Sequence, residues 1–199
     1  MTTLDWLECL CRYNDPVKAP RTPFSVRMSD GVIYTFASDL CTIITAQGIQ
    51  DVPTFEDLQK VQDETVRKIF SIVQSVQDRC VEIGILDALL LKEILETPKW
   101  TQEEFLELWN SEREMPNVRI NRACYSAPVL ARALFGWSEP LARVFQVPDF
   151  FDREGGHGDL LMFGSSHLLV LCAPYGAAAS MSPEAMIELP AGSFVAKKG

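Results

Sequence analysis

The sequence has no long hydrophobic run. Its most apolar stretch, Gly84 to Leu91, is interrupted by Asp87, and it is far shorter than the roughly 20 apolar residues that a membrane-spanning helix needs. The opening MTTLDWLECLCRYND also lacks the basic region and apolar core of a secretory signal. We therefore expect a cytoplasmic protein with no membrane partner.

The sequence also lacks the cysteine patterns that bind metals. Its six cysteines form no C-x-x-C pair and no Cys/His cluster at zinc spacing. A chain of 199 residues can bury a core without disulfides, so we expect reduced and mostly buried thiols. No metal and no cofactor are predicted. The cysteines are Cys9, Cys11, Cys41, Cys80, Cys124 and Cys172.

Positive charge is scarce, since the formal net charge is −9. This charge argues against a protein that coats nucleic acid by bulk attraction, but it leaves room for a local basic face. Basic residues are relatively frequent between Arg119 and Arg143. A solvated helix face is the simpler interpretation of these arginines.

The first part of the chain, residues 1–50, predicts one helix and three strands. Leucines spaced three to four apart indicate an amphipathic helix over residues 3–13. Residues rich in Val, Ile, Thr and Phe then predict three short strands, with turns near Asp30-Gly31 and Ser38-Asp39.

The next part, residues 51–116, reads as an inserted helical section. Thr54 is a plausible N-cap for a first helix. A second helix is expected over about 79–96, because apolar residues cover most of its circumference. A third helix is expected to open at Thr101 with a capping box and to stop before Pro116.

From residue 117 the pattern returns to strands. The second part, residues 117–176, predicts a strand NVRIN, a helix with Pro128 in its first turn, a strand PLARVFQV and a hairpin LLMFGSSHLLVLCAP. The last part, residues 177–199, reads as a C-terminal tail that ends in a loose segment, AGSFVAKKG.

The two strand-rich parts have the same order of elements. Aligning Phe36 with Phe163 also places Ser38 on Ser165. The repeated order predicts an α+β fold made of two duplicated halves, each a helix plus an antiparallel meander, with the helical section inserted between them. Whether the halves form one sheet stays open.

The segments NVRINRACYSAPVLARALFGW and LLMFGSSHLLVLCAP resemble the opening and the end of a half-domain of the DNA sliding clamps. The resemblance covers about half the chain and implies a clamp-like fold, in which helices line a ring with basic residues. By position, Arg122 and Arg132 would face nucleic acid. The chain departs from the family in two ways. It could hold only one such domain, and its first helix carries the acidic residues Asp5 and Glu8, which make a poor surface for DNA.

A second resemblance leads to a different function. Cys124, just before a helix, and the later GHGDLLMFGSSHLLVLC look like the cysteine peptidases of the NlpC/P60 kind. The resemblance implies Cys124 as nucleophile, His167 as general base and Asp159 as the aspartate of the Gly-Asp-Leu strand. The interval from Cys124 to His167 is short for that family, and no polar residue follows to orient the imidazole.

The function predicted first is a non-enzymatic, clamp-like scaffold or interaction module that binds protein partners. Such a module would self-associate through strand edges as a homo-oligomer, because exposed edges must be paired or protected. DNA is a conceivable partner that the net charge does not support. The alternative is a Cys/His hydrolase.

Overall fold

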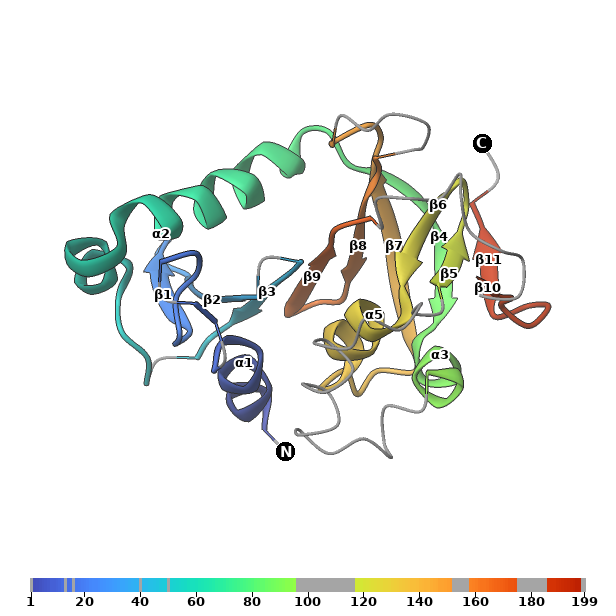
Figure 1. Cartoon of the computed structure of the whole chain (residues 1–199), viewed down its shortest axis with the longest axis horizontal. Coiled ribbons are helices and arrows are strands. Elements are labelled where there is room, and N and C mark those ends of the chain that lie inside the picture. Colours follow the sequence, from blue (N-terminus) through green and yellow to red (C-terminus); the bar gives the residue numbers. More distant parts are fainter. Residues whose placement is uncertain are drawn as a thin grey trace.

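The structure is a computed structural model that describes residues 2–12, 14–15, 17–39, 41–49, 51–95, 117–151, 158–174 and 186–197. Its fold is α+β, as predicted (Figure 1). The helices are α1 (Thr3–Cys11), α2 (Phe55–Gln77), α3 (Ala88–Ile94) and α5 (Ala127–Leu134). The strands are β1 (Phe24–Arg27), β2 (Ile33–Ser38), β3 (Thr42–Gln47), β4 (Val81–Asp87), β5 (Asn117–Ile120), β6 (Ala123–Ser126), β7 (Leu141–Val147), β8 (Leu160–Gly164), β9 (Leu168–Cys172), β10 (Met186–Ile187) and β11 (Phe194–Ala196).

Most strands belong to one continuous antiparallel sheet, with the order β1-β2-β3-β9-β8-β7-β4-β11. The sheet contains two three-stranded meanders, β1-β2-β3 and β7-β8-β9, which join where Ile44 of β3 pairs with Val170 of β9. A helix precedes each meander, α1 in one half and α5 in the other. The two halves therefore share one sheet; that they arose by duplication stays a prediction.

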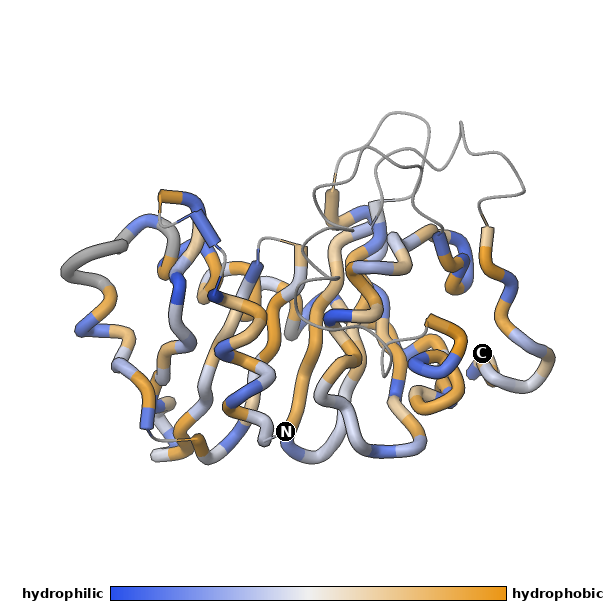
Figure 2. Tube along the Cα trace, turned by 60° about the horizontal axis from the view of Figure 1, so that its bottom comes forward, coloured by the Kyte–Doolittle hydropathy of each residue, from blue (hydrophilic) through white to orange (hydrophobic). Residues whose placement is uncertain are grey.

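The alternation of side chains divides the interior into two cores. Ile44 and Val170 point to the face covered by α1 and α5, whereas Ile43 and Leu171 point to the face covered by α2. Both faces of the central strands are thus buried, and Figure 2 shows these strands as largely hydrophobic. This arrangement explains their nearly continuous apolar sequence.

The pairing register corrects the alignment of Phe36 with Phe163. Ala37 pairs with Ile44, and Phe163 pairs with Val170, so Ala37 is the residue that corresponds to Phe163 around the Ile44–Val170 pair. Phe36 lies on the opposite face, against α2. A shift of one residue exchanges the faces of a strand, and the identity of the two letters is therefore not a structural equivalence.

The helix expected over 79–96 is wrong in its first half, because residues 81–87 form strand β4. Residues 81–87 pair with β7 and β11, and a Cβ at Gly84 would clash with the Val195 carbonyl of β11, so this close pairing requires glycine. The helix α3 begins only after Asp87, whose side chain accepts a hydrogen bond from the Leu90 amide at 2.9 Å. The third expected helix, which opens at Thr101, lies outside the described residues.

A smaller sheet with the order β10-β5-β6 leads into α5. Seven of the eight residues of α5 are buried, and the helix contacts β3, β9, β6 and α3. Pro128 lies in its first turn, as predicted. Of the helices formed by described residues, none has the length and hydrophobicity that crossing a bilayer requires.

The C-terminal segment is not a loose end, because β11 pairs with β4 at the edge of the large sheet. A charged cluster holds this edge together: Glu82 accepts hydrogen bonds from Arg143 Nε at 2.9 Å and from Lys197 Nζ at 2.8 Å. The hydrogen bonds from these two donors lower the pKa of Glu82 to about 2, and the bond from Arg143 has the larger effect. The cluster therefore links β7, β4 and the residue that follows β11.

We expect the Glu82→Gln variant to be less stable than the wild type at neutral pH. Because folding lowers this carboxyl pKa from 4.5 to about 2, its stabilisation is complete above about pH 5 and disappears as the pH falls towards 2. Urea midpoints of both proteins between about pH 7 and pH 3 should converge on acidification. A difference that stays constant with pH would contradict the linkage.

Candidate functional site

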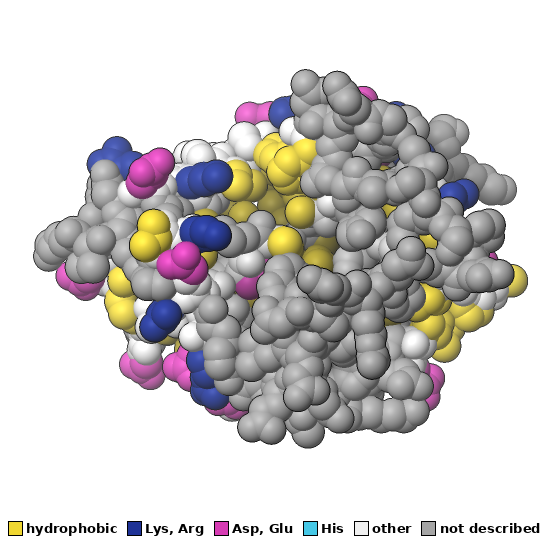
Figure 3. Space-filling view, in the orientation of Figure 1, with side chains coloured by type: hydrophobic (Ala, Val, Ile, Leu, Met, Phe, Trp, Pro, Cys, Tyr) yellow, Lys and Arg dark blue, Asp and Glu magenta, His cyan; other side chains and the backbone are white. Residues whose placement is uncertain are grey.

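A groove lies between the second half of α2 and one end of the large sheet, and its volume is about 340 Å³. It is bounded by Phe70, Val73 and Gln74 of α2, by strands β2, β3 and β9, and by the turns 28–30 and 165–167. Figure 3 shows hydrophobic side chains at the bottom of a hollow below α2. The volume falls within the range of small-ligand sites.

The groove has an aromatic floor because α2 rests on the sheet through phenylalanines. Phe36 of β2 meets Phe70 of α2 edge-on, with 6.0 Å between ring centroids, and Phe70 also contacts Phe55 at 5.7 Å. Edge-to-face contacts of this kind fix ring orientation. Phe36 is almost fully buried, whereas Phe70, Tyr34 and Leu169 are half-buried and keep part of their apolar surface open.

The rim of the groove is polar. Gln47 at the end of β3 contacts His167 of the β8–β9 turn, with 3.3 Å between Gln47 Oε1 and His167 Nδ1. Asp30 and Gln74 are exposed on other sides of the opening. Thr45, by contrast, lies at the bottom with 6% of its surface exposed. An apolar floor with a few convergent polar groups is typical of binding sites.

Arg122, one of the two arginines predicted to face nucleic acid, binds the fully buried Asp159. Its Nε and Nη2 donate to the two carboxylate oxygens at 2.7 and 2.8 Å. The Asp149 amide donates to the same carboxylate at 2.9 Å. This pairing raises the pKa of Arg122. Arg122 thus ties the β5–β6 turn to the connection between β7 and β8.

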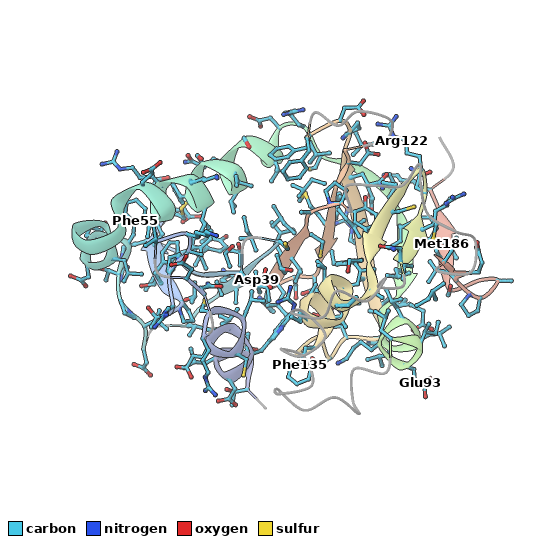
Figure 4. All side chains as sticks on the ribbon, in the orientation of Figure 1. Asp39, Phe55, Glu93, Arg122, Phe135 and Met186 are labelled. Atoms are coloured by element: carbon cyan, nitrogen blue, oxygen red, sulfur yellow. The ribbon has the colours of Figure 1, made fainter. Side chains whose placement is uncertain are left out.

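Arg132, the second arginine, forms an ion pair with Asp39 at 2.8 Å. Asp39 follows β2, and its carboxylate also accepts the amides of Cys41 and Thr42. Figure 4 places Asp39 between α1 and α5. Helix α5 is buried, and α1 exposes Asp5, Glu8 and its C-cap residue Arg12. That Arg132 faces nucleic acid stays a prediction.

The structure separates the residues of the predicted peptidase site. Cys124 lies in β6 and is 3% exposed, while Asp159 is bound by Arg122. His167 is exposed in the β8–β9 turn. Because Asp159 and His167 flank opposite ends of β8, roughly 17 Å of strand lies between them. Asp159 therefore cannot orient His167, and the three residues do not form one site.

The described residues include no group of three or more His, Cys, Asp or Glu side chains that could hold a metal ion. All six cysteines are thiols. Burial raises the pKa of Cys11 to about 12 and also raises the pKa of Cys172. Since the thiolate is the reactive form, these two thiols are chemically inert at neutral pH.

Sequence analysis did not identify the groove residues. Phe36 was used only in an alignment, and Thr45 and Phe70 drew no attention because both fit ordinary strand and helix patterns. One available signal was the density of aromatic residues on the faces of β2 and α2 that pack together. This signal does not distinguish the floor of a groove from a closed hydrophobic core unless the distance between α2 and the sheet is known.

Comparisons with known proteins assign no family to this chain. No protein-family model matches it, and no curated protein matches it. Among solved structures, the DNA polymerase III beta subunit of Thermotoga maritima is similar, at 12% sequence identity and a TM-score of 0.41. The match covers 92% of this chain and 65% of the beta subunit, which is less than two thirds of that protein. At this TM-score the similarity is distant and does not establish a function.

Proposed function

We propose that the protein is a non-enzymatic interaction module that binds a segment of a partner protein in the groove between α2 and the sheet. The observation that carries this proposal is the half-buried aromatic and aliphatic surface of Tyr34, Phe70 and Leu169 inside a polar rim. Anchor residues of protein interfaces enter pockets of this composition. A groove of about 340 Å³ suits one or two side chains of a segment and is too small for a whole domain.

Enzymatic function and nucleic-acid binding are not part of this proposal. Asp159 and His167 lie at opposite ends of β8, and Arg122 and Arg132 form ion pairs with Asp159 and Asp39. The chain as a whole is acidic, with a net charge of −9. A protein partner with a partly basic binding segment therefore fits better than a polyanion.

Selection of random displayed peptides on the full chain tests the groove. The Gln74→Trp variant places a large side chain at the opening, and Ser75→Trp places the same side chain on the exposed neighbouring position of α2. We expect enriched peptides to bind the wild type and Ser75→Trp equally and to bind Gln74→Trp at least about tenfold more weakly. Equal binding to all three proteins, or no enrichment, would contradict the proposal.

Self-association through β11 is a further part of the proposed module. β11 is the last strand of the sheet, and Val195 and Ile85, which are paired across β11 and β4, are 61% and 45% exposed. A second copy could add its own edge strand beside β11 and shield Val195. We expect light scattering to give a discrete homo-oligomer that resists moderate salt. A monomer at all concentrations would exclude this contact.

A further inference from the structure

The outer edge of β11 lacks the devices that usually protect the edge of a sheet. Natural edge strands are blunted by charged side chains, by proline or by a covering segment. The strand β11 consists of Phe194, Val195 and Ala196, which include no charge and no proline. Within the described part of the chain, no strand pairs with its outer side. Val195 and Ala196 are both exposed, so a second strand can reach this edge.

The backbone of β11 shows which groups face outwards. The Ser193 carbonyl accepts an amide of β4 at 2.7 Å, and the Lys197 amide donates to a β4 carbonyl at 2.8 Å. Hydrogen-bonded and non-hydrogen-bonded pairs alternate along an antiparallel ladder, so Val195 also directs its backbone groups towards β4. The alternation leaves the N–H and C=O groups of Phe194 and Ala196 directed away from β4, towards a second strand.

The opposite edge of the large sheet, at β1, is covered in its first half. Figure 1 shows β1 and β11 at opposite sides of the molecule. The Ser25 amide donates to the Pro53 carbonyl at 2.8 Å, and Ser25 forms a parallel bridge with Thr54. A partner strand would have to displace residues 53–54 before it could pair with β1. In the small sheet, β6 is buried and β10 has two residues. Of the sheet edges formed by described residues, β11 is therefore the one that a second copy reaches without rearrangement.

We propose that β11 pairs antiparallel with β11 of a second copy about a two-fold axis at Val195, an inference that rests on the proposed self-association. Phe194 of each copy then exchanges both backbone hydrogen bonds with Ala196 of the other. The two Val195 residues form the non-hydrogen-bonded pair at the axis, with about 4.5 Å between their Cα atoms. Because a two-fold contact uses the same strand on both copies, the assembly closes as a dimer that joins the two large sheets.

The side chains of this edge are complementary to their own copies. Val195 pairs with Ile85 of β4, and both are exposed. The two-fold axis extends this pair into one row across the joined sheet, with Ile85 and Val195 of one copy followed by Val195 and Ile85 of the other. Pairs of β-branched residues across strands are favourable. Lys197 lies opposite Ser193 of the other copy, so the register sets no like charges face to face.

Cysteine cross-linking of the full chain tests the register. In a buffer of oxidised and reduced glutathione, the Val195→Cys variant should form a covalent dimer, because a Cα separation of about 4.5 Å lies within the range of disulfides. Ile85→Cys is the matched control, on the same face and also exposed. Its Cα atoms would lie roughly 15 Å apart in the dimer, so it should give no more covalent dimer than the wild type.

Sedimentation equilibrium of charged variants tests the same contact without a cross-link. Val195→Glu places two carboxylates opposite each other at the axis, and we expect it to raise the dimer dissociation constant at least about tenfold. Val81→Glu introduces the same charge at another exposed valine, which pairs with β7 and lies outside the part of β4 that faces β11. This control should dimerise as the wild type does. Circular dichroism checks that both variants are folded.

The outcomes separate this inference from the proposed function. A wild type that is monomeric at all concentrations removes the proposed self-association, and the inference with it. A wild-type oligomer that withstands Val195→Glu, or that gives no covalent dimer with Val195→Cys, overturns the inference alone, because the copies then meet through another surface. A wild-type assembly larger than a dimer also overturns it, since a two-fold contact closes at two copies.

Discussion

Replacing Trp6 by alanine is expected to lower the free energy of unfolding by about 4 kcal/mol. Trp6 is 1% exposed, and its indole Nε1 donates to the Arg132 carbonyl of α5 at 3.0 Å. Its ring lies against Gly136, where no Cβ could be accommodated without displacing it. The substitution removes a large buried ring and leaves a cavity between the two helices.

Chemical denaturation monitored by circular dichroism measures this loss. Glu8→Ala, on the exposed face of the same helix, serves as the control and should stay within about 0.5 kcal/mol of the wild type. If Trp6→Ala costs less than about 1 kcal/mol, α1 does not anchor the first half of the chain to the second, and the packing of α1 on α5 would need revision.

The Arg122→Met variant is expected to lose about 3 kcal/mol. Asp159 is fully buried, so removing its partner leaves an uncompensated carboxylate with the Asp149 amide still donating to it. The value lies at the lower end for broken buried ion pairs, because the Arg122 side chain is 39% exposed and water can reach the site.

Arg119→Met, three residues earlier on an exposed position of β5, is the matched control and should change stability by less than about 0.5 kcal/mol. Adding Asp159→Asn to Arg122→Met should recover part of the loss, because the buried charge is then removed. A double variant that is less stable than Arg122→Met would show that the ion pair is not the source of the effect.

The order of elements was largely predictable from the sequence. The first helix, the three strands of the first half and the hairpin of the second half are confirmed, because their periodicity and turn residues agree locally. The helix predicted for residues 81–87 was wrong, because their sequence pattern taken alone suits a buried helix as well as a strand. Pairing with β7 and β11 decides the outcome, and both partners are distant in sequence.

The candidate site was not predictable for the same reason. Arg122 and Arg132 were predicted to face nucleic acid, and their ion pairs with Asp159 and Asp39 could not be foreseen, because they depend on contacts across 37 and 93 positions of the chain. The groove exists because α2 covers one part of the sheet, which follows from tertiary structure alone.

The most direct measurement is a titration of the isotope-labelled full chain with N-acetyl-tyrosinamide, followed by amide chemical shifts. The central claim is that the groove between α2 and the sheet accepts an anchor side chain of a partner segment. We expect saturable shifts, with a millimolar dissociation constant, concentrated at Thr45, Gln47, Phe70 and Leu169 and absent in Gln74→Trp. Shifts scattered over the surface, or none in the groove, would contradict the claim.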